Sequence, residues 1–360
     1  IREKQFGHAT QVLEQAKKQG IDGDKLNTLE GQLASINQSG NVDNAVPTQE
    51  QLSSLLEHYQ NGRYSDAEMS ARSLSTQFPH HNFSWKILSA VLKKTGRLSE
   101  AVFSGEKTVE ITPGDAEAHF NLGNTLKELG RLEEAEASYT RAIRLKPDFA
   151  KAHSNLGNML KDLGRLEEAE ASYRQAIKLE AGYAEAHNNL GITLQEQGRL
   201  EEAESSYRQA IKLQVDYAEA YNNLSITLKE LGRLEEAEVS CREAVRLNRD
   251  YTEAHSNLGV TLQELGRLEE AETSYAQAIA LNPDYAEAHY NLSITLKGLG
   301  RLDEAEASCR QAISLKPEFA KAHNNLGSTL QELGRLEEAE ESYTQAIKLK
   351  ADYAEAYSNL

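Results

Sequence analysis

The chain has 360 residues, with 39 Lys and Arg against 56 Asp and Glu, for a formal net charge of −17 at pH 7. Nucleic acids and anionic membrane surfaces repel such an excess of negative charge. No apolar run approaches the roughly 18 residues that a membrane helix needs. The composition therefore predicts neither nucleic-acid binding nor membrane insertion.

The N-terminal segment differs from the rest of the chain. Residues 1–38 are predicted to form a helical hairpin that turns at "GIDGD", and residues 39–47, "SGNVDNAVP", are predicted to be a linker. The acidic turn has too few oxygen ligands at fixed spacing for a calcium loop. Because Ile1 is not an initiator Met and Leu360 lies seven residues into a new repeat, we expect a longer parent chain.

From residue 48 onward the sequence repeats every 34 residues. Residues 48–115 hold two divergent repeats, residues 116–353 hold seven regular ones, and residues 354–360 begin another. Divergent repeats are typical of the capped end of a stack. Repeats 218–285 and 286–353 also match as pairs, which suggests duplication of a two-repeat block.

The sequence pattern of each repeat predicts two helices. In 116–149 they are expected over 116–129 and 132–145, with Gly130 as the break, because glycine readily adopts the left-handed conformation of a helix end. The Asp before each new repeat is predicted to be an N-cap, and Asp216 with Glu219 has capping-box spacing. Runs such as "EEAE" at 133–136 are predicted to form a solvated outer face. The fold class is therefore all-α.

Glycine in the first helix and in the turn, alanine in the second helix and proline at its end resemble the tetratricopeptide repeat (TPR) family over residues 48–360. "AHxNLGxxLxxxGRLEEAExSY" is similar to the repeat region of O-linked N-acetylglucosamine transferases. The resemblance implies a right-handed superhelical solenoid of antiparallel helix pairs, with the first helices on the concave face. It also implies an asparagine ladder that holds substrate polypeptide.

One asparagine recurs at a fixed place in every regular repeat, at the border of the exposed stripe of the first helix. A carboxamide has two donor hydrogens and an acceptor, so a row of them can pair with a peptide backbone whatever its side chains are. The alternative is that each one bonds the neighbouring repeat and stiffens the stack. These residues are Asn121, Asn155, Asn189, Asn223, Asn257, Asn291 and Asn325, with Asn359 beginning the next repeat.

Three residues after four successive asparagines comes a β-branched apolar residue, which is predicted to lie at the centre of the exposed stripe. The four are Ile192, Ile226, Val260 and Ile294, and Lys229 and Lys297 flank them. Contiguous apolar surface with a polar rim marks contact sites. The sequence therefore predicts a polypeptide-binding centre in residues 184–319, unless these residues came only with the duplicated block.

Residues with other chemistry are explained by the repeat. The histidines that recur once per repeat lie too far apart to share a metal ion, and Cys241 and Cys309 are predicted to be small core residues. No nucleophile, phosphate loop or metal quartet stands out, so no enzyme activity and no cofactor are predicted within residues 1–360. The unpaired cysteines slightly favour a cytoplasmic location.

Three functions remain open. The first is a polypeptide-binding scaffold that presents substrate within a larger, glycosyltransferase-like protein. The second is a structural protein that assembles with copies of itself through solenoid ends or faces. The third, an adaptor for C-terminal carboxylates, needs Lys or Arg in the groove where this chain has Phe120, Ser154, Asn188 and Asn222.

Overall fold

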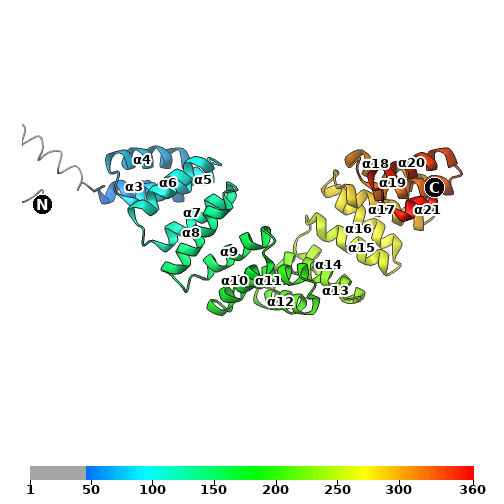
Figure 1. Cartoon of the computed structure of the whole chain (residues 1–360), viewed down its shortest axis with the longest axis horizontal. Helices are drawn as coiled ribbons and strands as arrows, with labels where there is room; N and C mark the ends of the chain where they lie inside the picture. Colours follow the sequence, from blue (N-terminus) through cyan, green and yellow to red (C-terminus); the bar gives the residue numbers. More distant parts are fainter. Residues whose placement is uncertain (1–45) are drawn as a thin grey trace, which may run out of the picture. The chain divides into compact units, whose positions relative to one another are not determined.

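The computed structural model describes residues 46–360, and within that range it contains helices and no strand. Two compact units divide at residues 152 and 153, and each is described by itself (Figure 1). The predicted hairpin at 1–38 and nearly all of the predicted linker lie outside the described residues. The all-α prediction is confirmed.

The first unit holds helices in antiparallel pairs: α3 (Gln49–Gln60), α4 (Tyr64–Gln77), α5 (Asn82–Lys94), α6 (Leu98–Ile111), α7 (Ala116–Glu128) and α8 (Leu132–Leu145). Helix α9 (Ala150–Asp162) includes the dividing point. The second unit continues with α10 (Leu166–Leu179), α11 (Ala184–Glu196), α12 (Leu200–Leu213), α13 (Ala218–Glu230), α14 (Leu234–Leu247), α15 (Thr252–Glu264), α16 (Leu268–Leu281), α17 (Ala286–Gly298), α18 (Leu302–Leu315), α19 (Ala320–Glu332), α20 (Leu336–Leu349) and α21 (Ala354–Asn359).

The turn inside each repeat depends on glycine. Gly130 has φ of 80°, a left-handed conformation that costs other residues energy. The helices on either side, Ala116–Glu128 and Leu132–Leu145, match the bounds expected from the sequence to within one residue. The left-handed glycine therefore reverses the chain and sets the length of both helices.

The capping prediction is correct at one repeat and wrong at another. Asp115 precedes α7 directly, and its side chain accepts a hydrogen bond from the Ala118 backbone N–H at 3.0 Å. Tyr217, however, is the N-cap of α13, and its side chain makes no capping bond. Asp216 lies one residue too early, so the predicted capping box with Glu219 does not form. The reason is that Tyr217 occupies the N-cap place that Asp115 holds before α7.

The core of each repeat is built from alanine, leucine and one large residue of the second helix. Tyr207 on α12 is fully buried, and Ala203 and Ala210 on either side of it are fully buried too. Leu190 and Leu194 of α11 pack on the same core. In repeats 218–251 and 286–319 the tyrosine is replaced by Cys241 and Cys309, both fully buried as predicted. Small residues thus bring the helices close, and one side chain per repeat fills the remaining space.

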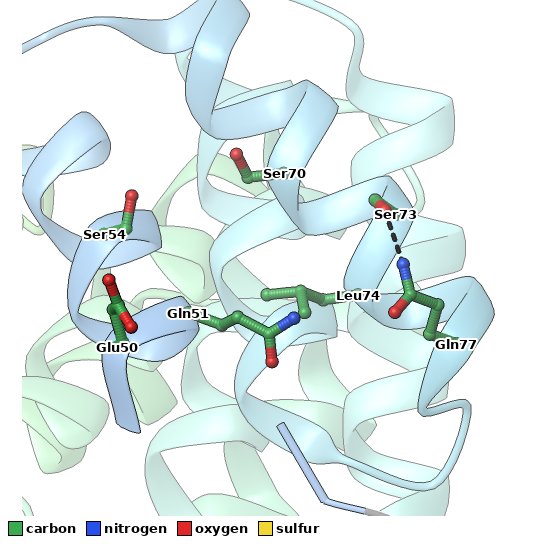
Figure 2. A pocket seen from close by; sticks show the side chains of 7 residues that line it. All are labelled: Glu50, Gln51, Ser54, Ser70, Ser73, Leu74 and Gln77. Carbon is green, nitrogen blue, oxygen red and sulfur yellow. Dashed lines mark hydrogen bonds between the residues drawn. The ribbon is translucent and has the colours of Figure 1, made fainter. Parts of the chain in front are cut away.

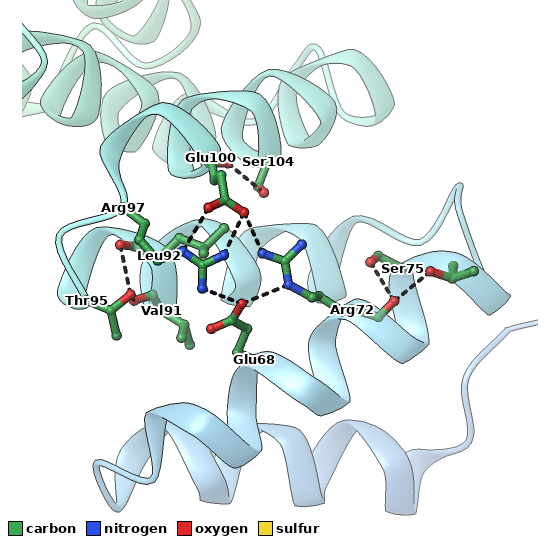
Figure 3. A network of polar contacts seen from close by, with 10 residues as sticks. Glu68, Arg72, Ser75, Val91, Leu92, Thr95, Arg97, Glu100 and Ser104 are labelled. Carbon is green, nitrogen blue, oxygen red and sulfur yellow. Dashed lines mark hydrogen bonds and ion pairs between the residues drawn. The ribbon is translucent and has the colours of Figure 1, made fainter.

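Arginine and glutamate side chains join successive second helices. Arg97, in the turn before α6, pairs with Glu68 of α4 at 2.6 Å and with Glu100 of α6 at 2.7 Å, and Arg72 also contacts both glutamates (Figure 3). The second unit repeats this arrangement: Arg233 pairs with Glu204 and Glu236. The last Glu of an "EEAE" run is therefore not simply solvated where such an arginine binds it. Glu204, for example, has a side chain only 14% exposed.

Within residues 46–360, none of the helices combines the length and the apolarity that crossing a bilayer requires.

Candidate polypeptide-binding groove

The recurring asparagines of the second unit form a chain of hydrogen bonds from one repeat to the one before it. Asn223 Nδ2 donates to Asn188 Oδ1 at 3.1 Å, and Asn257 Nδ2 donates to Asn222 Oδ1 at 2.8 Å. The other bonds of this kind are Asn189 to Asn158 at 2.9 Å, Asn325 to Ser293 at 2.8 Å and Asn359 to Asn324 at 3.2 Å. At these places the row contributes to stacking, which was the alternative left open by the sequence.

Three of the acceptors, Asn188, Asn222 and Asn324, share one place in the repeat, and reasoning from the sequence missed this second row of amides. Asn188 is fully buried and Asn222 is 4% exposed. A buried amide is costly without hydrogen-bond partners, and the asparagine of the next repeat supplies one. The doublets "NN" at 188–189, 222–223 and 324–325 were the available signal.

Two asparagines of the row have side chains that make no hydrogen bond within residues 46–360. They are Asn121, which is exposed on α7 of the first unit, and Asn291, which is half-buried on α17. Asn223 and Asn257 bond to an asparagine 35 residues earlier in the chain. At the same distance before Asn121 lies Lys86, and before Asn291 lies Ser256. Asn155 lies half-buried on α9.

The apolar line is less exposed than the sequence indicated. Ile192, Ile226, Val260 and Ile294 are all half-buried. Val260 packs against the buried cluster that includes Leu258, Leu262 and Tyr275. These residues are therefore less exposed than the centre of an exposed stripe would be, and for Val260 the cover comes from this buried cluster. Their outer atoms remain accessible.

The lysines beside this line are engaged with the following repeat. Lys229 lies 3.7 Å from Glu264, and Lys297 lies 3.0 Å from Glu332. Lys297 also donates to Ser328 Oγ at 2.6 Å. The positive charge expected at this edge is thus balanced by carboxylates of the next repeat.

Gln195 occupies the place equivalent to these lysines in a tyrosine-containing repeat. Its Oε1 accepts from Tyr207 Oη at 3.1 Å and from Thr227 Oγ1 at 3.0 Å, while its Nε2 donates to Glu230 at 3.1 Å. Three side chains of the two following helices, α12 and α13, therefore fix one amide. Tyr275 and Thr295 hold Gln263 in the same way.

Burial keeps the tyrosine and cysteine side chains of this region in their neutral forms. Burial raises the pKa of Tyr207 well above its usual range and raises the pKa of Cys309 to about 11. The half-buried histidines bond to backbone: His289 Nε2 lies 3.0 Å from the Pro283 carbonyl oxygen. Among the residues described, no three His, Cys, Asp or Glu side chains are grouped to hold a metal ion. The groove therefore offers hydrogen bonds and apolar contact.

Helix pairs that repeat every 34 residues and contact only their neighbours define an α-solenoid. Models of the tetratricopeptide repeat match residues 105–137, 183–250, 216–284, 256–318 and 320–353, and a TPR repeat model matches 123–162 and 157–198. The chain belongs to the tetratricopeptide repeat family, whose members are typically scaffolds for protein–protein interaction.

Solved structures of similar fold include "Functional Characterization of Pseudomonas Aeruginosa pilF", at 20% identity and a TM-score of 0.53, with 58% of this chain and 95% of that chain covered. Another is the "APC/C hetero-tetramer Cut9-Hcn1", at 17% identity and a TM-score of 0.57, covering 84% and 59%. "YrrB: a TPR protein with an unusual peptide-binding site" is 27% identical at a TM-score of 0.44, covering 51% and 95%. No curated protein matches the sequence.

Proposed function

We propose that this chain is a non-catalytic scaffold that binds extended polypeptide along the first helices of residues 184–319. One observation carries the proposal. Asn223 and Asn257 each use one N–H on the preceding repeat, while no group in residues 46–360 donates to their Oδ1 atoms. An acceptor and a second N–H therefore remain on each carboxamide, and these are the groups that a peptide backbone needs.

The hydrogen bonds between repeats also favour peptide binding. An amide held by its neighbour has lost its rotational freedom before a ligand arrives, so binding does not have to order it. The half-buried Ile192, Ile226, Val260 and Ile294 add apolar contact beside it. Recognition through backbone and apolar surface accepts many sequences, as a substrate-presenting arm requires. The similarity of the repeat to O-linked N-acetylglucosamine transferases supports an arm of that glycosyltransferase-like kind.

At Asn291 a role in peptide binding can be tested apart from a role in repeat stacking, because its side chain has no hydrogen-bond partner in the described part of the chain. We expect Asn291→Ala to leave the urea midpoint unchanged and to weaken binding of a fluorescent, uncharged Gly/Ser/Thr 20-residue peptide a few-fold. Asn223→Ala serves as the matched control, because it removes a bond to the nearly buried row and should cost about 1 kcal/mol of stability. Unchanged peptide affinity in both variants would contradict the backbone-binding role.

The apolar line is tested by replacing Ile226 and Val260 with Asn, the residue found at this place in Asn124 and Asn158. We expect the solenoid to fold and the same peptide to bind several-fold more weakly. The native mass of both proteins, measured by light scattering, tests the alternative of self-assembly. Self-assembly would be favoured by two results together. The native protein would form a polymer that grows with concentration and that the double substitution shortens, and neither protein would bind the peptide.

A further inference from the structure

Of the large apolar side chains between Gln49 and Leu145, two are exposed, and both occupy the same place in successive repeats. Met69 on α4 is 67% exposed and Phe103 on α6 is 54% exposed. The regular repeats carry a smaller or a polar residue at this place, such as Ala137 in the next repeat. Exposed apolar side chains that lie together mark interaction surfaces.

Trp85 of α5 extends this apolar surface. Its ring meets the Phe103 ring edge to face, with centroids 6.2 Å apart, and its Nε1 donates to the Pro79 carbonyl oxygen at 3.0 Å. In the last regular repeats the same two places hold His323 and Glu341, which line a hollow between α18 and α20. The corresponding place between α4 and α6 is therefore aromatic where the later one is polar.

Helices α4 and α6 are held as neighbours by ion pairs. Arg72 of α4 contacts Glu100 of α6 at 2.6 Å (Figure 3). Met69 and Phe103 each lie about one helical turn from this pair, so their side chains belong to neighbouring helices. We call Met69, Trp85 and Phe103 the N-terminal apolar patch.

Another surface near the start of the described chain is polar. Gln51, Ser54 and His58 of α3 occupy the places of a tryptophan and two leucines in α5. A hollow of about 340 Å³ between α3 and α4 is lined by serine, glutamine and glutamate side chains and by Leu74 (Figure 2). An apolar helix face gains little on such a surface, because burying polar groups without partners costs free energy.

The chain contains a segment that needs an apolar surface. Residues 25–37, the second helix of the predicted N-terminal hairpin, lie outside the described range and carry four large apolar residues at helical spacing: Leu26, Leu29, Leu33 and Ile36. The hairpin of residues 1–38 is too short to bury enough apolar area by itself, because chains below about 40 residues usually need a disulfide, a metal or another surface.

The connection to α3 is long enough to bring this segment to the patch. Residues 38–46 span up to roughly 30 Å when extended. Helices packed side by side lie about 10 Å apart, so α6 is roughly 20 Å from α3 across α4. The reach of the chain therefore exceeds the distance to be covered.

We infer that residues 25–37 dock as a helix on the N-terminal apolar patch, with their leucine face on Met69, Trp85 and Phe103. The patch is chosen because its side chains match that face, whereas the surface of α3 is polar. The docked helix covers the two divergent repeats. The inference goes beyond the proposed function, because no residue of 184–319 takes part and the occupant belongs to the chain itself.

Trp85 is the single tryptophan of the chain, so its fluorescence reports whether the patch is covered. Leu29→Lys with Leu33→Lys, made in the full chain, removes the apolar face of the segment. We expect the Trp85 emission to shift to longer wavelength and acrylamide to quench it more strongly. Asn27→Lys with Ser35→Lys adds the same charge to the opposite face of the same helix, and it is expected to leave both signals unchanged.

The reverse test changes the patch and follows the segment by amide hydrogen exchange in the full chain. Met69→Glu with Phe103→Glu introduces the residue that Glu341 provides at the same place, so α4 and α6 are expected to fold. Exchange in residues 25–37 should become about ten-fold faster, because local opening then costs less free energy. Val239→Glu makes the same change at an exposed apolar residue of α14 and should leave that exchange unchanged.

Each outcome supports or overturns the inference. Exchange in residues 25–37 that is equal in the native chain and in Met69→Glu/Phe103→Glu overturns it, as does Trp85 fluorescence that the leucine substitutions leave unchanged. Shielding of Trp85 that grows with protein concentration, together with a dimer in sedimentation, assigns the cover to a second copy and also overturns it. Binding of the uncharged peptide should be the same in all these variants, so a failure of the proposed groove is detected separately.

Discussion

A Cβ atom on Gly191 would lie 2.6 Å from Cε1 of Tyr207, closer than real side chains approach. The waist of α11 therefore has to be glycine for the ring on α12 to pack there. The two regular repeats that carry serine at this place, at Ser225 and Ser293, carry cysteine in place of the tyrosine. The chain thus alternates between two solutions of the same packing problem.

This coupling predicts non-additive stability. Gly191→Ala should destabilise the protein by roughly 1–3 kcal/mol, because the added methyl group displaces a buried ring. In repeat 218–251, Cys241→Tyr alone should destabilise for the same reason. Adding Ser225→Gly should restore much of the loss, with a coupling energy of about 0.5–3 kcal/mol in a urea-unfolding cycle. Strict additivity of the two changes would show that these positions do not share the space.

The ion pairs between arginine and glutamate of successive second helices predict that the fold loses stability in acid. Hydrogen bonds from Arg72 and Arg97 hold the pKa of Glu68 below its usual range, and Arg97 does the same for the pKa of Glu100. Because the folded pKa is lowered, this stabilisation is present above the unfolded pKa and is lost as pH falls through the folded pKa. The thermal midpoint should therefore drop as pH is lowered from about 4.5.

Arg97→Gln provides the comparison for this effect. It removes one of the two arginines that Glu68 and Glu100 share, so the thermal midpoint should be lower at pH 7 and the difference from the native chain should shrink in acid. High salt at pH 7 should reduce the difference as well, because exposed ion pairs are screened. A difference that is the same at every pH would assign the effect of Arg97 to packing.

We expect the rate at which the buried cysteine thiols are alkylated to report local opening of the fold. Cys309 is fully buried, and burial raises the pKa of its thiol to about 11, so little thiolate is present and little is accessible. Iodoacetamide at pH 8 should label the native protein slowly and the urea-unfolded protein fully. Ala307→Cys, at an exposed position of the same helix, is the positive control. Native labelling of Cys309 as fast as that control would contradict its burial.

Removing repeats should shorten the solenoid without unfolding it, because contacts run only between neighbours. Deletion of 286–319 should keep the mean helicity per residue by circular dichroism. It leaves Asn325 without its Ser293 acceptor, since Gly259 takes that place. Deletion of the two-repeat block 252–319 offers Ser225 instead. The free energy of unfolding lost per deleted repeat should therefore be smaller for the deletion of 252–319 than for the deletion of 286–319. Collapse to random coil in either case would contradict nearest-neighbour stability.

The sequence alone was sufficient for the repeat length, the helix pairs and the buried cysteines, because these follow from local patterns. Gly130 marks the turn and the helical period marks the buried stripe, and both depend on residues close in the chain. The cap at Asp216 was misjudged because Tyr217, and not Asp216, directly precedes the helix.

Only the tertiary structure decided how residues of successive repeats meet. The bond from Asn223 to Asn188, the pair of Lys229 with Glu264 and the partial cover of Val260 join positions about one repeat apart, and helix packing sets their distances. The same holds for Gly105. A Cβ atom there would lie 3.1 Å from Leu122 Cδ1, and that distance depends on how α6 and α7 pack.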